Sequence, residues 1–237
     1  MKLSIVIPVY NEEQTVREVI ERVLAVTLDG LDREIIVVDD GSTDASARVV
    51  DDAALTFGDR VRAFHSPINL GKGAALRIGF KYASGDFIVI QDADLELNPE
   101  EYGRLLRPIL DGHADVVYGS RFAGGAAGVS LRTKVANVFL TTLTNVLFWG
   151  RLTDMETAYK VMRREVLACV RLRCVGFDFE PEITAKLLLG GYRIVEVPIA
   201  YRPRRADEGK KIHWTDGADA VYTLLKCRFV GRRDVTR

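Results

Sequence analysis

The chain has 237 residues, of which 48% are hydrophobic and 28% charged, with 33 basic and 33 acidic side chains. These values are ordinary for a soluble globular protein and allow one large domain or two small ones. The charge is unevenly placed: residues 1–100 carry 18 acidic and 10 basic groups, and residues 101–237 carry 15 acidic and 23 basic groups. The second half is therefore expected to meet an anionic partner. Nucleic acid is not predicted as a partner of this chain.

Three features bear on location. The first residues run directly into a strand pattern, so no signal peptide is expected. The three cysteines lack metal-ligand spacing and are expected to be reduced thiols of a cytosolic protein. The most membrane-like stretch is residues 135–150, which is shorter than the roughly 20 residues that a bilayer span needs. It can instead lie in a membrane interface.

The first 120 residues alternate strand and helix patterns five times. Strands are predicted at residues 3–9, 34–38, 61–64, 87–90 and 114–118. Apolar residues at helical spacing follow each of the earlier strands, and Asn11 is expected to cap the first helix with Gln14 as its partner. This alternation predicts an α/β fold with a doubly wound, mostly parallel sheet.

Three carboxylates follow the fourth predicted strand at alternate positions, namely Asp92, Asp94 and Glu96. In open α/β sheets, ligands bind outside the carboxyl ends of the strands. If strand geometry continues past Asp92, the three side chains point to one side and suit Mg²⁺ or Mn²⁺. A solvated acidic turn before a helix opened by Asn98 and Pro99 would give the same pattern.

A glycine-rich turn lies at residues 69–77 and contains Gly71, Lys72 and Gly73. Two glycines and a lysine at a helix start are typical of a phosphate cradle, although a turn with an exposed lysine fits equally well. The spacing is not that of a P-loop. A dinucleotide-binding Rossmann domain is disfavoured, because residues 8–13 replace the glycine-rich turn that should follow the first strand.

The second half has a different character. One bent helix or two is predicted over residues 131–149, and strands are predicted at 158–162 and 192–198 with a helix at 181–189 between them. Residues 202–211 form a basic loop that contains a glycine. A closing helix at residues 214–229 is expected to pack into the core through the stripe Ala218, Val221, Tyr222, Leu225 and Phe229.

Five segments occur in an order that resembles glycosyltransferase family 2, the GT-A fold. They are Pro-Val-Tyr-Asn-Glu-Glu, Val-Val-Asp-Asp-Gly-Ser-Thr-Asp, Asn-Leu-Gly-Lys-Gly-Ala-Ala-Leu, Asp-Ala-Asp-Leu-Glu and Gly-Ser-Arg. Later segments, including Glu-Val-Pro-Ile-Ala-Tyr, resemble the branch of dolichyl-phosphate mannose synthases and polyprenyl-phosphate glucosyltransferases. The resemblance covers nearly the whole chain. It implies a donor-binding half at residues 1–121 and an acceptor-binding half at 122–237 of one GT-A domain.

The resemblance also implies roles for individual residues. Binding of the nucleotide-sugar donor is implied for Pro8, Tyr10, Glu12, Asp39, Asp40, Lys72, Asp92 and Arg132. Metal binding is implied for Asp92 and Asp94, with Glu96 standing where this branch often has glutamine. Catalytic roles are implied for Asp94, Arg121, Arg204 and Lys210. The segment at residues 154–159 departs from the pattern common in mannose synthases, so the sugar is left open.

The implied reaction moves a hexose from GDP-mannose or a UDP-hexose to a polyprenyl or dolichyl phosphate, with inversion and with Mg²⁺ or Mn²⁺ as cofactor. The enzyme would be peripheral on the cytoplasmic face of a membrane, alone or with a separate membrane-anchoring subunit. Two alternatives remain. A soluble hydroxyl acceptor would require a base, for which Asp154, Glu180 and Glu182 are candidates. A nucleotide-sugar binding module would have no turnover.

Overall fold

The computed structural model describes residues 1–28, 30–124, 128–203 and 214–236. The strands are β1 (Lys2–Val9), β2 (Asp32–Asp39), β3 (Val61–His65), β4 (Phe87–Ile90), β5 (Val116–Ser120), β6 (Lys160–Arg163) and β7 (Ile194–Pro198). The α-helices are α1 (Val16–Ala25), α2 (Ser46–Phe57), α3 (Lys72–Tyr82), α4 (Tyr102–Leu110), α5 (Leu131–Phe148), α6 (Arg164–Ala168), α7 (Phe179–Leu189) and α8 (Trp214–Val230). Short 3₁₀ turns lie at Gly58–Arg60, Pro99–Glu101 and Gly231–Asp234.

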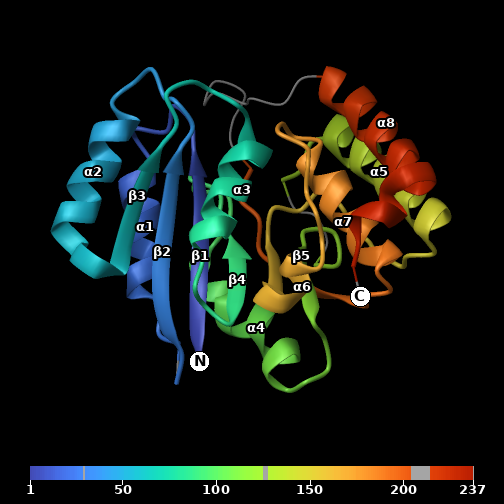
Figure 1. Cartoon of the computed structure of the whole chain (residues 1–237), viewed down its shortest axis with the longest axis horizontal. Coiled ribbons are helices and arrows are strands. Elements are labelled where there is room, and N and C mark those ends of the chain that lie inside the picture. The colour runs from blue at the N-terminus through green and yellow to red at the C-terminus, as the bar shows by residue number, and fades with distance from the viewer. Residues whose placement is uncertain (29, 125–127, 204–213, 237) are drawn as a thin grey trace.

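The described strands form one sheet in the order β3-β2-β1-β4-β6-β5-β7. Figure 1 shows β3, β2, β1 and β4 in this sheet. Strand β6 runs antiparallel to both β4 and β5, and every other pairing is parallel. The sheet is therefore mostly parallel and doubly wound, as the alternating pattern predicts. Strands β6 and β7 come from the second half of the chain, so the sheet continues through both halves.

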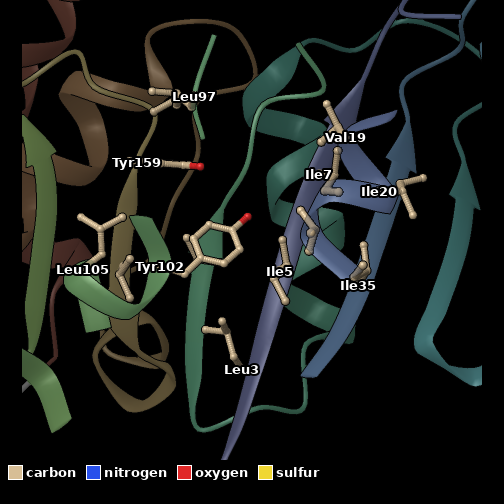
Figure 2. Close-up of a cluster of buried hydrophobic side chains, with 14 of the residues drawn as sticks. Leu3, Ile5, Ile7, Val19, Ile20, Ile35, Leu97, Tyr102, Leu105 and Tyr159 are labelled. Atoms are coloured by element: carbon tan, nitrogen blue, oxygen red, sulfur yellow. The ribbon is translucent and has the colours of Figure 1, made fainter. Parts of the chain in front are cut away.

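The core lies on both faces of this sheet, because successive strand residues point to opposite sides. Ile5 and Ile7 of β1 pack with α1 and α4 on one face, whereas Val6 packs with α3 and α7 on the other. Figure 2 shows the first of these clusters. Within it, the hydroxyls of Tyr102 and Tyr159 each donate to Oε1 of Gln91, at 2.7 Å in both cases. This buried contact anchors the residue that directly follows β4.

Helices α5 and α8 form a further layer beyond α7 (Figure 1). The predicted core stripe of the last helix is wrong: Tyr222, Leu225 and Phe229 are 65%, 41% and 84% exposed. The face of α8 that packs against α5 and α7 instead carries Ala220, Leu224 and Cys227. Both faces of α8 have apolar residues at helical spacing, so periodicity alone could not decide which one is buried.

The predicted cap of the first helix is also wrong. Asn11 has a positive φ of 50°, and its side-chain oxygen accepts from the backbone N–H of Thr43 at 2.8 Å. Helix α1 begins at Val16, and Thr15 at its start makes no side-chain capping bond. Asn11 thus joins the loop after β1 to the loop after β2.

Candidate active site

The parallel strands bring three sequence segments to one edge of the sheet. Val9 at the end of β1 lies beside Asp39 at the end of β2, and Ile90 at the end of β4 lies beside Val6. Residues 8–12, Asp39, Asp40 and the acidic turn after β4 therefore gather at the carboxyl edge, where α/β sheets bind ligands.

The first segment is fixed by its neighbours. The backbone N–H of Glu12 donates to Oγ of Ser46 at 2.7 Å, and Oε2 of Glu12 accepts from the hydroxyl of Thr15 at 2.9 Å. Pro8, near the end of β1, and Tyr10, in the loop that follows, are both partly exposed. Pro8, Tyr10 and Glu12, which are among the residues predicted to bind the donor, thus lie together at the sheet edge.

Asp39 is buried and makes two polar contacts. Its Oδ1 accepts from the backbone N–H of Ser42 at 3.2 Å, and its Oδ2 lies 3.3 Å from Nδ1 of His65. The other ring nitrogen of His65 lies 2.9 Å from Asp51. Burial lowers the pKa of His65, but the hydrogen bonds with Asp51 and Asp39 outweigh burial, and the pKa is raised.

Asp40 holds the glycine-rich turn. Its two carboxylate oxygens accept the backbone N–H groups of Leu70 and Gly71 at 3.0 and 2.6 Å. Burial, together with the charge of Asp39, raises the pKa of Asp40, while these two N–H groups oppose the rise. Gly71 has a φ of +104°, a backbone conformation that side chains other than glycine rarely adopt.

The glycine-rich turn is not a free phosphate cradle. The N–H groups of Gly73 and Ala74 donate to the carbonyls of Gly176 and Val175 at 3.3 and 3.0 Å. A Cβ on Gly73 would lie 2.7 Å from the carbonyl oxygen of Cys174. The glycines therefore allow close backbone packing against residues 174–176, and these N–H groups are not available to a phosphate.

The acidic turn after β4 differs from its prediction, because the strand ends at Ile90 and residues 93–96 form a bend. The strand geometry that would have put Asp92, Asp94 and Glu96 on one side therefore does not continue past β4. Within the described ranges, no three His, Cys, Asp or Glu side chains gather as a metal site would require. Glu96 accepts from the hydroxyl of Tyr201 at 2.8 Å instead.

Asp92 and Asp94 nevertheless fit a divalent ion. Protein-bound Mg²⁺ usually takes one or two carboxylates and obtains its other ligands from substrate phosphates and water. Asp94 accepts from the backbone N–H of Glu96 at 3.1 Å through one oxygen, and Asp92 lies at the sheet edge with a quarter of its side chain exposed. Two hard oxygen donors are thus present without a complete protein cage.

Lys72 connects Asp92 to a buried chain of charges. Its ammonium lies 2.8 Å from Asp92 and 3.2 Å from Oε1 of Glu180, and Oε2 of Glu180 pairs with Lys160. Burial lowers the pKa of Lys72, but the carboxylates of Asp92 and Glu180 outweigh burial, and the pKa is raised. Lys160 is fully buried, and burial lowers its pKa despite the opposing effect of Glu180. Because its pKa is raised, Lys72 remains charged at the site.

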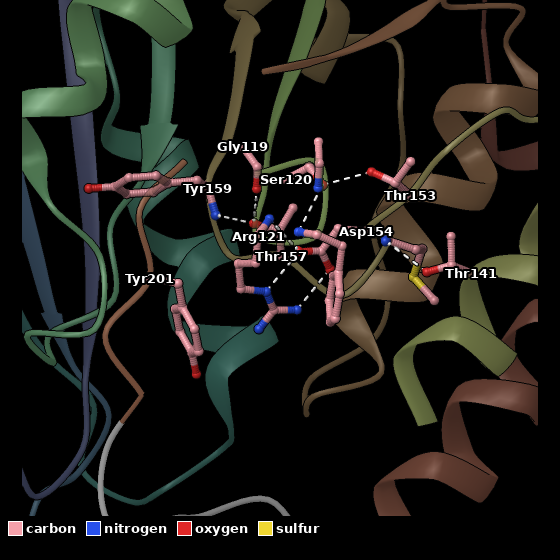
Figure 3. Close-up of polar contacts among 12 residues, drawn as sticks. Gly119, Ser120, Arg121, Thr141, Thr153, Asp154, Thr157, Tyr159 and Tyr201 are labelled. Carbon is pink, nitrogen blue, oxygen red and sulfur yellow. Dashed lines mark hydrogen bonds and ion pairs between the residues drawn. The ribbon is translucent and has the colours of Figure 1, made fainter. Parts of the chain in front are cut away.

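Arg121 and Asp154 form a second ion pair, shown in Figure 3. The guanidinium makes two hydrogen bonds to the carboxylate, at 2.7 and 2.8 Å, and the backbone N–H of Arg121 makes a third at 3.0 Å. Asp154 is fully buried, and the guanidinium carbon lies 5.3 Å from the ring centre of Tyr201. This fork is a rigid cation, because planar bidentate pairing fixes the orientation of the guanidinium.

All three candidate bases are already paired. Asp154 is held by Arg121, and Glu180 lies between Lys72 and Lys160. Glu182 pairs with Lys186 at 2.7 Å. Each of the three carboxylates is therefore already engaged with at least one cation of the chain.

Sequence reasoning missed Glu156, whose Oε1 atom is buried and has no hydrogen-bond partner among the described residues. Burial, with the nearby charge of Glu180 as the next cause, raises the pKa of Glu156 to about 7. The available signal was the departure from the family pattern at residues 154–159, which contain it.

The remaining predicted residues belong to the second half. Arg132 is exposed in the first turn of α5 and borders a shallow, wide-open apolar hollow whose described lining residues all belong to that helix. Arg204 and Lys210 lie outside the described residues. The structure thus gathers the predicted donor-side residues at the sheet edge and places Arg132 on the helical layer.

A doubly wound sheet with a carboxylate-rich edge defines an α/β protein whose ligand site lies at the carboxyl ends of its strands. The family model "Glycosyl transferase family 2" matches residues 4–171, and the chain belongs to this family. It is a glycosyltransferase, which sets aside the alternative of a binding module without turnover.

Two relatives show which members of the family the chain resembles. It is 31% identical to polyprenol monophosphomannose synthase of Mycolicibacterium smegmatis, over 98% of this chain and 89% of the relative. It is 33% identical to dolichol-phosphate mannosyltransferase of Pyrococcus furiosus, over 89% of this chain but 59% of the relative. The predicted branch of the family is therefore confirmed.

The fold is similar to that of a solved structure, glucosyl-3-phosphoglycerate synthase from Mycobacterium tuberculosis in complex with Mn²⁺, uridine diphosphate and phosphoglyceric acid. The TM-score is 0.68 at 26% identity, covering all of this chain and 80% of the other. The similarity supports the predicted fold class. In the described part of this chain, no helix has the length and apolar character required to cross a membrane.

Proposed function

We propose that this chain transfers a hexose from GDP-mannose or a UDP-hexose to a polyprenyl or dolichyl phosphate at the cytoplasmic face of a membrane. The observation that carries the proposal is the hollow at the start of α5. It is lined by Leu131, Arg132, Val135, Ala136 and Phe139. One cation among apolar side chains suits a molecule with a phosphate head and a hydrocarbon tail.

On the donor side, Asp92 and Asp94 would hold Mg²⁺ or Mn²⁺. Such an ion, when bound, offsets the negative charge that develops on the leaving diphosphate. Lys72 keeps Asp92 in place and adds a fixed positive charge at the same edge. The Mn²⁺ and uridine diphosphate named for the similar solved structure support this arrangement.

On the acceptor side, no strong base is required. A phosphate monoester is ionised near pH 7 and can attack the sugar directly. This agrees with the pairing of Asp154, Glu180 and Glu182, each of which already has a cation. Arg121 carries a rigid guanidinium on which a phosphate oxygen can be oriented.

The membrane contact would be formed by α5 and α8, which both expose apolar stripes. The stripe of α5 is Leu131, Val135, Val138, Phe139 and Val146, and that of α8 is Tyr222, Leu225, Phe229 and Val230. Trp149 follows α5 in the left-handed conformation, with φ of 58° and 68% of its surface exposed. An exposed tryptophan beside basic residues is typical of a membrane interface.

Incubation with polyprenyl phosphate in vesicles and labelled GDP-mannose or UDP-glucose, followed by lipid extraction, tests the proposal. We expect a labelled lipid whose formation needs a divalent ion and is lost in Asp94→Asn. Vesicle flotation tests the surface: Phe139→Glu should reduce binding, whereas Leu55→Glu, an exposed control on α2, should not. Full transfer in the presence of a chelator would refute the metal requirement.

A water-soluble acceptor is the second candidate, because the similar solved structure holds phosphoglyceric acid. The same assay separates the two. Label that stays in the aqueous phase on a phosphorylated or hydroxylated small molecule would favour this candidate. A preference for polyprenyl phosphate over that molecule at equal concentration would exclude it.

A further inference from the structure

Glu156 presents a buried polar atom that the described part of the chain leaves unsatisfied. Its Oε1 has no hydrogen-bond partner among the residues that the structure describes. Buried side-chain oxygens in folded proteins nearly always have a partner, so an unpaired one indicates that a ligand or water completes it.

The backbone around Glu156 is fixed on both sides. Lys160 donates to the carbonyls of Met155 and Thr157, and the hydroxyl of Thr157 donates to the carbonyl of Gly119 at 2.6 Å. The N–H of Met155 donates to Thr141 at 3.1 Å. The loop is therefore held by several hydrogen bonds, while Oε1 of Glu156 has none among the described residues. This is the arrangement of a preformed binding group.

Glu156 is within electrostatic reach of the two charged groups of the site. Its electrostatic neighbours are Glu180 and Lys160, which connect through Lys72 to Asp92, and Arg121 and Asp154. The first group leads to the proposed position of the donor diphosphate, and the second carries the cation proposed for the acceptor phosphate. The transferred sugar must occupy the space between those two phosphates.

We propose that Glu156 binds a hydroxyl group of the transferred hexose and selects the donor by that hydroxyl. This inference rests on the proposed glycosyl transfer and names a residue that recognises the transferred sugar.

The chemistry of the carboxyl group favours a hydroxyl over the other ligands. A phosphate would be repelled by the carboxylates of Glu180 and Asp154. A metal ion would be opposed by the ammonium of Lys160 and the guanidinium of Arg121, and no three ligating side chains gather within the described segments. A hydroxyl both donates and accepts, so it can bond the carboxyl group in either protonation state, and the pKa of about 7 makes both states available.

Donor binding and transfer by the full chain test this inference. The wild-type protein is screened with GDP-mannose and UDP-glucose, and the better donor is then compared with its 2-, 3-, 4- and 6-deoxy analogues. For Glu156→Ala we expect a loss of about 10- to 100-fold in affinity and in kcat/KM for the complete donor. For one deoxy analogue, the variant and the wild type should bind equally. Affinity for the nucleotide diphosphate alone should be unchanged in calorimetry.

Two further variants keep the result interpretable. Glu156→Gln has nearly the same shape and serves if the alanine variant does not fold; it should lose affinity for the same complete donor by a smaller factor. Glu165→Ala, an exposed position on α6, should behave as the wild type.

Equal losses for the complete donor and all four analogues would overturn the inference. So would unchanged donor affinity with a collapse of kcat for a water-soluble alcohol, because that result would make Glu156 a general base. The proposed lipid acceptor can fail independently: donor binding that depends on Glu156, without transfer to polyprenyl phosphate, would support the sugar contact and reject the acceptor.

Discussion

Replacing Lys160 with methionine should destabilise the protein strongly. The ammonium is fully buried, and it donates to the carbonyls of Met155 and Thr157 and pairs with Glu180. Methionine fills similar space but leaves two carbonyls without their donor and Glu180 with Lys72 alone. Removing one partner of a buried ion pair costs about 3–5 kcal/mol. At about 2–4 °C per kcal/mol for a chain of this size, Tm should fall by roughly 6–20 °C.

Urea unfolding followed by circular dichroism measures this effect. The midpoint should fall while the slope of the transition stays constant, because the unfolded surface is unchanged. Lys81→Met, at an exposed lysine of α3, is the matched control and should change stability by less than about 0.5 kcal/mol.

A double variant tests the cause. Lys160→Met combined with Glu180→Gln removes both charges and should recover part of the loss, because the carboxylate is no longer buried with a single cation. A loss of under about 1 kcal/mol for Lys160→Met, or strict additivity of the two substitutions, would refute this account of the buried charges.

Three further predictions concern single positions. In folded protein the pKa of Glu156 is raised to about 7, so its stabilising contribution is complete below pH 4.5 and is lost as the pH rises through 7. As the pH rises from 4.5 to 8, the free energy of unfolding of Glu156→Gln, measured by urea titration, should therefore increase relative to that of the wild type. The increase should be about 2 kcal/mol after allowance for partial exposure of the side chain. Parallel pH profiles of the two proteins would contradict this. Asp40→Ala should lose about 2–3 kcal/mol, because the N–H groups of Leu70 and Gly71 lose their acceptor, and should weaken nucleotide binding in calorimetry; unchanged values of both would exclude this role. Trp149→Gly should raise stability by about 1 kcal/mol by relieving a left-handed backbone, while vesicle flotation falls; equal flotation would remove Trp149 from the membrane surface.

Much of the fold could be predicted from local patterns. The run Phe87–Ile90 is apolar on both sides, which is typical of a buried parallel strand, and the structure places it as β4 in the middle of the sheet. Strand β6 was also predicted, at residues 158–162, but its direction was not, because antiparallel pairing with β4 and β5 depends on how the second half returns to the sheet. The periodicity of apolar residues indicates which face of a strand is buried. It does not indicate whether the neighbouring strand runs parallel or antiparallel.

The candidate site was predicted unevenly. The motifs that contain Asp39, Asp92 and Arg121 located the carboxyl edge, because strand ends and polar turns are adjacent in sequence. The partners of these residues were not predictable, since Asp154, Lys72 and the contacts of Asp40 come from distant segments. The alternate spacing of Asp92 and Asp94 predicted side chains on one side only if strand geometry continued past Asp92. A bend follows β4 instead.

Sequence by itself determined the order of strands and helices, the family and the carboxylates at the sheet edge, because each is written in residues close together along the chain. Tertiary structure decided which face of α8 is buried, since both faces are apolar and only packing against α5 and α7 selects Leu224 over Phe229. It also decided that Oε1 of Glu156 has no hydrogen-bond partner among the described residues, while its neighbours in the loop are bonded. Burial and pairing depend on groups brought together from far apart in the chain, and no local pattern contains them.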